Sequence, residues 1–583
     1  MRIHILPMWR ILILLGTLIW PVSLLAQTVP TLPTLPQAQV STTRPSINGT
    51  SCAGSNLATV QACINAAAAL TGASGNLNHE VIITAGSSFT GPLNLATRGV
   101  GSTGWIIIRS SGSGSLPEGT RVSPASASSM AKIIVDGSGA QRAIQARDNA
   151  HHYWMIGLEV QTATSGANQN MVDTGGDDSV SNRTTTHHFM IDRCYIHGTP
   201  TSQVVRGVTI NAYQGYTGVI DSHIADIHKS GADSQAVWTF YNPGPILIQN
   251  NFLEAGSENI MFGGVSTLDA SVIPADITIV RNTISKQAAW KNQGSPNNWV
   301  LKALIEFKFG KRILVEGNRM MGSWTPDACS ACDVGGFSFR LTVRNDDNSS
   351  PYVVLEDLTI RHNKISDVAG QYNLTASDGV FTTGTSKRIH IHNNLWYDMS
   401  QDGGTSFDEI WGTGFTAPGT DYTMEHNTIV QNSTSKGHFV AIDSGGNFQR
   451  YSCRNNIFST HGGSSFSVTD ENSGSTQIFN KTALDFMFQS NYIYTNNAIV
   501  NPSGAQSGGG GLPGNFWPAS FTAVQFVNIA GDDYHLAPGS PYKNAGSDGK
   551  DLGADIDALE AALAGTGTVD STPPTPPINL RIL

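Results

Sequence analysis

The chain has 583 residues, of which only 13% are charged, and its formal net charge is −10. These values argue against a nucleic-acid partner, because phosphate binding needs a basic surface and no cluster of Lys or Arg is present. The many glycines, 61 in all, and the scarcity of amphipathic segments favour an all-β, turn-rich protein.

The first 26 residues have the pattern of an export signal. Arg2 and Arg10 precede the apolar run ILILLGTLIWPVSLLA, which ends at the small residue Ala26. A proline breaks this run, and it is short for a membrane span. We therefore expect a secreted protein, extracellular or periplasmic, that begins near Gln27 after removal of residues 1–26. An uncleaved membrane anchor is the alternative, and no later segment could cross a bilayer.

A linker and one helix are predicted next. Residues 27–50 are rich in Pro and Thr and carry no core pattern, which is typical of a linker. The segment NLATVQACINAAAAL (56–70) has the spacing of an amphipathic helix, and Asn56 is placed to cap it. The residues on its apolar face are Leu57, Val60, Ile64 and Ala67.

Six cysteines in an exported chain permit disulfides. One pair flanks the start of the predicted helix, and a second pair shares the loop DACSACD. Zinc is the weaker alternative for that loop, because it lacks a second pair of ligands. We predict two local disulfides and two packed thiols within strands: Cys52–Cys63, Cys329–Cys332, Cys194 and Cys453.

One pattern recurs beyond the helix: an apolar residue, two residues, Asn, one residue and another apolar residue. Its instances are Asn251, Asn282, Asn318, Asn363, Asn394, Asn427, Asn456 and Asn491, with Cys194 and Ser222 at the same position upstream. The intervals run from 28 to 45 residues, and a fixed unit with variable insertions indicates a solenoid. Stacked Asn side chains can bond to one another and tolerate a tight bend, so we expect a ladder at one corner of each coil.

These motifs resemble the right-handed parallel β-helix proteins of the pectate-lyase-like superfamily. LATVQACINAAAA…EVIITAGSSFTGPLNL is similar to their capping helix and first coil, and DYHLAPGSPYKNAGSDGKDLGADIDAL (533–559) to their closing segment. The resemblance implies one β-helix over residues 51–565, a monomer, and an extracellular polysaccharide as partner. NNFLEAGSENIMFGG and LKALIEFKFGKRILVEGN look like a secreted subgroup from which no activity carries over. The tail, 566–583, resembles a linker into a fibronectin-type domain and is expected to be disordered.

Each coil also carries a strand that can be placed by its distance from the Asn corner. Four of these strands are QAVWTFY (235–241), ENIMFGG (258–264), KALIEFK (302–308) and SFRLTVR (338–344). Alternation predicts that Ala236, Trp238, Phe240, Met261, Ala303, Ile305, Phe307, Phe339, Leu341 and Val343 point inward. The outward rows are then Gln235, Val237, Thr239 and Tyr241; Glu258, Ile260 and Phe262; Lys302, Leu304, Glu306 and Lys308; and Ser338, Arg340, Thr342 and Arg344.

Neighbouring rows of a parallel sheet lie about 4.8 Å apart, so this grid predicts a charged patch. Glu258 is expected beside Lys302, and Glu306 beside Arg340. Two like charges, Lys308 and Arg344, would form an edge. The segment DIHKSGADS adds Asp233 at the mouth of the patch, together with His228 and Lys229, and Tyr241 and Phe262 flank it.

The patch suggests a polysaccharide lyase that acts on an anionic, uronic-acid glycan. β-Elimination needs a base for the proton on C5 and positive charge to stabilise the enolate-like intermediate. The predicted catalytic residues are Lys302, Lys308, Glu306 and Glu258, with Lys302 or Lys308 as the base. The predicted substrate-binding residues are Arg340, Arg344, Tyr241, Asp233, Gln235 and Phe262.

The resemblance also leaves calcium open as a cofactor, although no linear calcium loop is present. DTGGDD (173–178) and NDDNSS (345–350) are interpreted as turns, and the pairs in HHY (151–153) and HHF (187–189) as strand starts rather than ligands. Three alternatives compete with the lyase: a structural ladder of ion pairs, a polygalacturonase-like hydrolase that uses Glu258 and Glu306, and a glycan-binding surface solenoid without catalysis.

Overall fold

The structure is a computed structural model that describes residues 29–565 with internal gaps. The gaps are 136–141, 164–168, 176–185, 268, 293–297, 326–328, 330, 334–335, 400–407, 412–417, 432–439, 444–447, 460–466, 471–474, 479–480, 489–490 and 501–511. The predicted export signal and the Pro-rich tail therefore lie outside the described residues.

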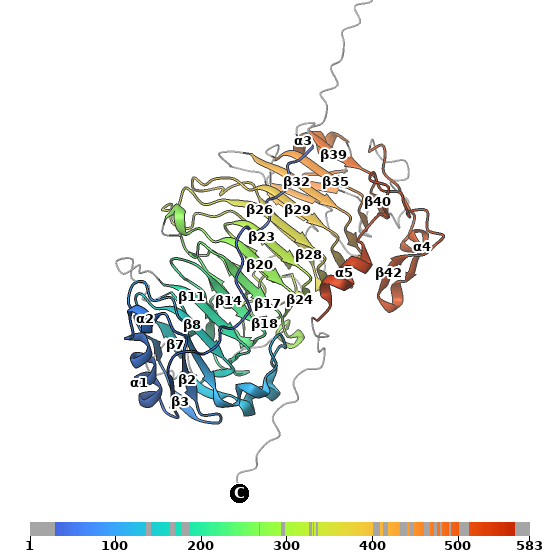
Figure 1. Cartoon of the computed structure of the whole chain (residues 1–583). Helices are drawn as coiled ribbons and strands as arrows, with labels where there is room; N and C mark the ends of the chain where they lie inside the picture. The colour runs from blue at the N-terminus through green and yellow to red at the C-terminus, as the bar shows by residue number, and fades with distance from the viewer. Residues whose placement is uncertain are drawn as a thin grey trace, which may run out of the picture.

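Three long sheets wind around one axis as a right-handed parallel β-helix, as the repeat predicts (Figure 1). Sheet A comprises β1 (Ser51–Gly54), β2 (His79–Ile83), β5 (Ile106–Ser110), β8 (His151–Ile156), β11 (His187–Asp192), β14 (Thr217–Ile220), β17 (Ile246–Gln249), β20 (Ala275–Val280), β23 (Gly310–Glu316), β26 (Leu355–Arg361), β29 (Lys387–His392), β32 (Gly419–Glu425), β35 (Phe448–Arg454) and β39 (Tyr492–Thr495). Sheet B comprises β3 (Ser88–Thr90), β6 (Ala131–Val135), β9 (Leu158–Thr162), β12 (Tyr195–His197), β15 (His223–Ile227), β18 (Phe252–Ala255), β21 (Thr283–Ser285), β24 (Arg319–Ser323), β27 (Lys364–Val368), β30 (Leu395–Tyr397), β33 (Thr428–Ile429), β36 (Ile457–Ser459) and β40 (Ala498–Val500).

Sheet C completes each coil. It comprises β4 (Leu93–Leu95), β7 (Ile144–Ala146), β10 (Gln169–Asp173), β13 (Val204–Thr209), β16 (Gln235–Thr239), β19 (Glu258–Phe262), β22 (Ile305–Phe307), β25 (Phe337–Leu341), β28 (Gly370–Thr375), β31 (Asp408–Trp411), β34 (Val440–Asp443), β37 (Ser467–Asp470) and β38 (Ser475–Ile478). Strands pair in parallel with the equivalent strand of the next coil, and the described end of sheet C is an antiparallel pair, β37 with β38.

The asparagine ladder lies at the corner between sheets A and B. The side-chain oxygen of Asn318 accepts two hydrogen bonds from Asn282, one from its backbone N–H at 2.9 Å and one from its side-chain NH2 at 3.0 Å. The side-chain NH2 of Asn318 in turn donates to the side-chain oxygen of Asn363 at 2.9 Å. The ladder runs in register from Asn251 to Asn456, which confirms the prediction for those seven residues. The predicted last member is wrong, because Asn497, not Asn491, accepts from the backbone of Asn456.

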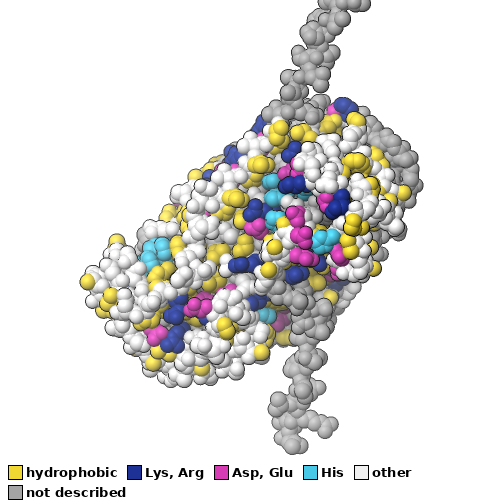
Figure 2. Space-filling model, turned by 45° about the vertical axis from the view of Figure 1, so that its right-hand side comes forward, with side chains coloured by type: hydrophobic (Ala, Val, Ile, Leu, Met, Phe, Trp, Pro, Cys, Tyr) yellow, Lys and Arg dark blue, Asp and Glu magenta, His cyan; other side chains and the backbone are white. Residues whose placement is uncertain are grey.

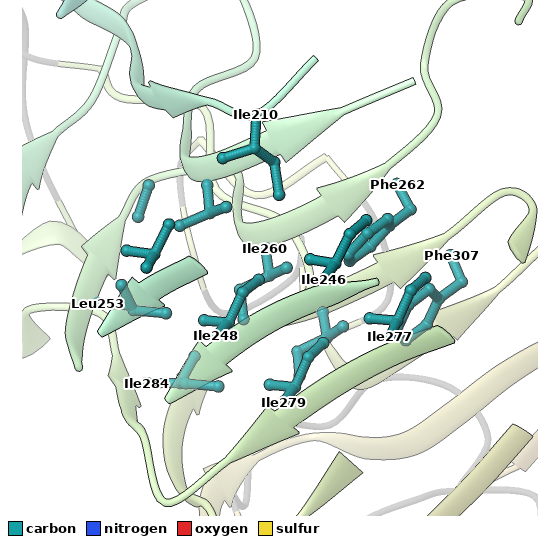
Figure 3. Close-up of a cluster of buried hydrophobic side chains, with 14 of the residues drawn as sticks. Ile210, Ile246, Ile248, Leu253, Ile260, Phe262, Ile277, Ile279, Ile284 and Phe307 are labelled. Carbon is teal, nitrogen blue, oxygen red and sulfur yellow. The ribbon is translucent and has the colours of Figure 1, made fainter. Parts of the chain in front are cut away.

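The core fills the space between the three sheets with stacked apolar side chains. Because strands pair in register, each side chain meets its equivalent from the next coil. Phe262 and Phe307 stack with ring centroids 5.0 Å apart, and Ile248 and Ile279 occupy equivalent positions on sheet A (Figure 3). This continuous cluster of buried residues is the main favourable term in folding, because it removes apolar surface from water.

Helices cover both ends of this core. Helix α1 (Leu57–Ala68) begins at Asn56, whose side chain accepts from the Thr59 N–H, as predicted. Near the other end, Leu484 and Phe488 of α3 (Lys481–Phe488) belong to the same buried cluster. Helix α5 (Ile556–Leu563) instead packs on the outer side of sheet B, against Leu395 of β30 and Val430 after β33, with the β41 (Phe526–Asn528) and β42 (Asp533–Leu536) hairpin. The other helices of the described residues are α2 (Gly72–Gly75) and α4 (Phe521–Val524).

The cysteines pair as predicted, but only one of the two free thiols lies within a strand: Cys453 is in β35, whereas Cys194 lies at the corner between β11 and β12. The two disulfides join Cys52 to Cys63 and Cys329 to Cys332, and Cys194 and Cys453 are buried thiols. None of the helices among the described residues is both long and apolar enough to cross a membrane.

The segment predicted as a linker instead forms a strap along sheet A, drawn in dark blue across β14 to β32 in Figure 1. The backbone N–H groups of Thr31, Thr34 and Gln37 donate to carboxylates of β32, β26 and β20, which are Asp421, Asp357 and Asp276, at 2.8, 2.9 and 2.7 Å. Three residues of extended polyproline chain span about 9 Å, which matches two coils of about 4.8 Å each. The TLPTLP repeat therefore matches the period of the helix.

Each Asp residue under the strap is bound by an arginine from the following coil. Arg388 donates to both oxygens of Asp357 at 2.7 Å, and Arg312 and Arg450 bind Asp276 and Asp421 in the same way. All six residues have positive φ, which turns these side chains outward at one corner of every coil. This geometry leaves no trace in hydrophobic periodicity, so the strap was not predicted.

Acid is expected to release the strap before the core unfolds. Burial raises the pKa of Asp357, but hydrogen bonds from Arg388 and Thr34 outweigh that effect and hold it below its usual value. The stabilisation is present above the unfolded-state pKa of about 3.9 and is lost as pH falls through the folded-state pKa. Hydrogen exchange at residues 31–41 should therefore accelerate below about pH 4. Asp357→Ala should accelerate it at pH 7, and Asp357→Asn, which keeps an acceptor, less so. Unchanged exchange in both variants would contradict the assignment.

Candidate functional site

The predicted charged patch lies on sheet C, where the four predicted rows are β16, β19, β22 and β25. Gln235 pairs with Glu258, and Glu306 pairs with Met261 on one side and Arg340 on the other. The order of the rows and the position of Glu306 beside Arg340 are therefore as predicted, but β19 and β22 pair one residue away from the predicted register, with Ile260 opposite Ile305 instead of Leu304.

The predicted alternation within the rows is wrong in β16, in β19 and at Leu304 before β22, which was predicted to point outward but belongs to the core. Val237, Ile260 and Phe262 belong to the core, so Phe262 cannot contact a substrate on the outer face. The cause in β19 is a bulge: the N–H groups of Asn259 and Ile260 both donate to the Leu304 carbonyl, at 3.0 and 3.2 Å. The extra residue reverses the alternation between Glu258 and the rest of the strand.

A buried lysine fixes this bulge. The Lys286 ammonium donates to the carbonyls of Ala255 and Ser257 and to the Asn259 side chain, at 3.1, 2.7 and 3.0 Å. Burial lowers its pKa to about 7, and the charges of Glu258 and Glu254 oppose that effect. Three acceptors around one nitrogen are satisfied only by three N–H groups, so the geometry favours the charged form. Lys286 therefore fixes the residues on both sides of Glu258, which are Ser257 and Asn259.

Two carboxyl groups with opposite pKa shifts occupy the centre of the patch. Burial, Glu306 and Asp233 raise the pKa of Glu258 to about 8. Burial also acts to raise the pKa of Glu306, but Arg340 and Lys308 outweigh it and lower the pKa. Glu306 lies 3.8 Å from Arg340 and accepts from the Thr342 hydroxyl at 3.2 Å. At neutral pH, Glu258 is therefore protonated and Glu306 ionised, an arrangement typical of acid–base sites.

Lys302 lies near Glu258 and Glu306 but is not suited to act as a base. Its ammonium is 2.9 Å from Asp233 and 3.0 Å from Asp333, which follows the Cys329–Cys332 disulfide. Burial alone would lower its pKa, but Glu258 and Asp233 more than offset that effect and raise it. The prediction of Lys302 as the base is therefore not supported, since it stays protonated; it supplies a fixed positive charge.

The other predicted residues are placed at the edge of the patch. Lys308 and Arg344 do not form an edge of unopposed charge, because Asp346 lies 3.2 Å from Lys308 and Asp378 lies 3.7 Å from Arg344. Tyr241 does not flank the patch as an exposed ring: it is buried, and its hydroxyl donates to the Gly175 carbonyl. That prediction is wrong because the chain beyond β16 folds back against neighbouring loops.

One residue that sequence reasoning missed is Arg206, in β13, one coil before the first predicted row. Its guanidinium lies 4.5 Å from the centre of the Trp238 ring and donates to the Asp233 carbonyl at 3.3 Å. Burial lowers its pKa to about 10. Its signal in the sequence is a lone charge within the apolar strand VVRGVT (204–209), which indicates an outward position next to the predicted grid.

Unpartnered polar atoms distinguish this cluster. Arg206 Nε, Gln235 Oε1 and Arg340 Nε are all buried and have no hydrogen-bond partner. Glu258 does have partners: it accepts from Gln235 at 2.6 Å, and its protonated carboxyl group shares a hydrogen bond with Glu306. Buried polar groups are nearly always paired, and unpaired ones need an explanation. Two donors and one acceptor in one cluster fit a ligand that is rich in oxygen.

The donor set does not fit calcium, which takes six to eight oxygen ligands. Within the cluster, Asp233 is paired with Lys302, Glu306 lies beside Arg340, and Glu258 holds a proton. The neighbouring ammonium and guanidinium groups would repel a divalent cation there, so the residues of this patch do not make a calcium site.

The two segments interpreted as turns agree with that interpretation as far as they are described. In NDDNSS, Asp347 accepts from the Ser349 N–H at 3.0 Å, which is a turn. In DTGGDD, Asp173 is paired with Arg142 at 2.6 Å, and residues 176–178 lie outside the described part.

The outer face of sheet A carries a second group of charges, visible beside the C-terminal segment in Figure 2. Glu316, Arg361, His392, Glu425 and Arg454 follow one another across five strands. Arg361 is 2.7 Å from Glu316, and Arg454 is 2.9 Å from Glu425. This face matches the structural alternative of a cross-strand ion-pair ladder. Ion pairs also occur in the sheet C patch, as between Glu306 and Arg340, but there they lie beside buried polar atoms without a partner.

Comparisons with known proteins show similarity to solved structures only. No protein-family model matches the chain, and no curated protein matches it. Pectate lyase Pel9A aligns with 87% of this chain and 96% of its own, at 12% identity and a TM-score of 0.35. An alginate lyase from Paenibacillus sp. str. FPU-7 aligns with 64% and 93%, at 11% identity and a TM-score of 0.29. PfbA, a surface adhesin of Streptococcus pneumoniae, aligns with 72% and 90%, at 14% identity and a TM-score of 0.28.

At these identities the similarity concerns the fold alone. The sheets and their pairing are those of a parallel β-helix, as the sequence motifs indicate.

Proposed function

We propose that this protein cleaves an acidic, uronate-containing polysaccharide by β-elimination on the outer face of sheet C. The observation that carries the proposal is the set of unpartnered atoms of Arg206, Arg340 and Gln235 beside Glu258, a carboxyl group whose pKa is raised to about 8. The solved lyases that resemble the chain in fold act, by their names, on pectate and alginate, which is consistent with this substrate class.

The positive groups are placed for the charge of the substrate. Arg340 and Lys302 are partly exposed, at 20% and 14% of their side chains, and lie on neighbouring rows of the patch. A guanidinium binds a carboxylate through two parallel N–H groups, and a fixed cation stabilises the enolate-like charge that forms on it. The Glu306 carboxylate, 3.8 Å from the Arg340 guanidinium, holds that side chain in place.

Glu258 is assigned the proton transfer because its pKa is near neutral. In the elimination, ionised Glu258 takes the proton on C5, and the C5–H electrons form the C4–C5 double bond. The bond from C4 to the glycosidic oxygen breaks, and that oxygen leaves with a proton from solvent. Lys302 and Lys308 do not need to change protonation in this scheme.

Hydrolysis by the same two carboxyl groups is less well supported. Glu258 and Glu306 form a protonated and an ionised pair, but they share a hydrogen bond, whereas a glycosidase holds its two carboxyl groups about 5–9.5 Å apart.

We also propose that the protein acts outside the cytoplasm, because the Cys52–Cys63 and Cys329–Cys332 disulfides persist in oxidising compartments.

The products distinguish these functions. Purified protein is incubated with several uronate polysaccharides and, as a control, a neutral glucan, with and without a chelator. Elimination yields ultraviolet-absorbing unsaturated ends, and it should proceed with the chelator present. Reducing ends without that absorbance would select hydrolysis. Retention on an immobilised acidic glycan without any product would select a non-catalytic binding protein.

Arg340→Ala is expected to lower kcat/KM on the acidic glycan by about 10²-fold, the usual loss when one preorganised donor to a developing charge is removed. Arg340→Lys should restore only part of it, because an ammonium cannot bind in bidentate fashion. Arg361→Ala is the matched control, since Arg361 is an ion-paired arginine on the outer face of sheet A. Equal losses for Arg340→Ala and Arg361→Ala would point to a general electrostatic effect and contradict the site.

A further inference from the structure

Four histidines form a compact group on sheet A near the N-terminal end, apart from the sheet C patch. His151 and His152 begin β8, and His187 and His188 begin β11, which confirms that both pairs are strand starts. The two strands pair in register, with His187 opposite His151. Figure 2 shows one group of histidines (cyan) toward the N-terminal end, separate from those among the charged residues of sheet A.

The backbone brings the two rings of each pair to the same place. Consecutive side chains of a regular strand point to opposite faces. His152 and His188 both have a φ of 58°, and this left-handed conformation breaks the alternation. The His151 and His152 Nδ1 atoms are 2.9 Å apart, and those of His187 and His188 are 2.7 Å apart. Two nitrogens at this distance share one proton, so one of them presents a lone pair.

Register then stacks one pair on the other. The His151 and His187 rings are 4.6 Å apart and nearly parallel, and the His152 and His188 rings are 4.3 Å apart. As a result, one nitrogen from each of His151, His152 and His187 lies within 4.8 Å of the others. Three imidazole nitrogens from two successive coils converge on one position.

We propose that His151, His152 and His187 bind a divalent transition-metal ion such as Zn²⁺, with His188 or water as a fourth ligand. Neutral imidazole prefers zinc, copper, nickel or cobalt, whereas calcium and magnesium prefer oxygen. Zn–N bonds of about 2.0–2.1 Å place two ligand nitrogens about 3.4 Å apart, so each pair needs to open only slightly. The ion would take the place of the shared proton and join two coils.

A guanidinium lies beside the group, since Arg98 donates to the His151 carbonyl at 3.4 Å. His151 is also oriented by a hydrogen bond with the Gly99 backbone. Tyr216 stacks on His188 at 4.1 Å, so a purely aromatic stack is the competing explanation. The proposal does not depend on the polysaccharide activity.

The test is metal binding by the whole chain, purified without a polyhistidine tag and stripped with a chelator. Titration with Zn²⁺ should show one saturable site, and Co²⁺ should give the visible absorption of a nitrogen-ligated ion. His152→Ala and His187→Ala should each weaken binding at least about tenfold. His390→Ala, on the same sheet but outside the group, should not.

His187→Asn keeps a planar polar side chain and should weaken binding as His187→Ala does, so it is the reference if the alanine variant does not fold. The absence of a saturable Zn²⁺ site in the parent chain would overturn the proposal. So would equal affinity in the parent chain and in a folded His152→Ala, His187→Asn double variant, which would leave the rings as a structural stack.

Discussion

Glu258→Gln is expected to reduce turnover of the acidic polysaccharide by about 10²–10⁴-fold, the usual contribution of a positioned proton-transfer group. The side chain is completely buried, and Gln can still accept from Gln235, so the change removes little besides the titrating group. Glu254→Gln is the matched control: Glu254 is another buried carboxyl with a raised pKa, about 7, but it lies on sheet B. Retained activity in Glu258→Gln, or an equal loss in Glu254→Gln, would contradict the assignment.

The same substitution should change the pH dependence of both rate and stability. As a base, Glu258 must be ionised, so the rate of the parent enzyme should rise with pH through about 8. The pKa in the folded chain lies above the unfolded value of about 4.3, so the folded state holds an extra proton between these values. The stability from this group is complete below about pH 4 and falls as pH rises toward 8. Urea unfolding should therefore show Glu258→Gln gaining stability relative to the parent between pH 5 and 9.

Phe307→Ala is expected to lower the free energy of unfolding by about 3–5 kcal/mol, because it opens a cavity between coils that cannot collapse. Phe307 is completely buried and stacks on Phe262, with Leu341 in the next coil (Figure 3). The adjacent Lys308→Ala is the control and should cost less than about 1 kcal/mol, since Lys308 is partly exposed and pairs with Asp346 at the surface. Denaturant unfolding measures both. Similar losses in the two variants would contradict the predicted orientation of this row.

The fold could be predicted because its signal repeats. One residue type returns at one position of every coil, and each Asn side chain satisfies the backbone of the coil before it, so the pattern cannot drift. The last member failed because FQSNYI (488–493) also fits the spacing. Asn491 precedes β39 on sheet A, and the corner is reached only at Asn497.

The order of the strands at the candidate site could be predicted, but the register of β19 against β22 and the orientation of several side chains could not. Counting from the Asn corner placed Glu306 beside Arg340 correctly, because that count does not depend on which way side chains face. The bulge at Asn259 depends on contacts with Leu304 and Lys286, which are distant in sequence. Phe262 was therefore assigned to the wrong face. The raised pKa of Lys302 could not be predicted from the sequence either, because its partner Asp333 comes from a loop whose position the repeat does not define.

The most direct test of the proposed function is a crystal structure of Glu258→Gln with an acidic oligosaccharide. The sugar should lie across β16, β19, β22 and β25 on sheet C, with a carboxylate on Arg340 and Lys302 and its C5 facing residue 258. An oligosaccharide bound instead over Glu316 and Arg361 on sheet A, or a sheet C site that stays empty while the sugar binds elsewhere, would contradict the proposal.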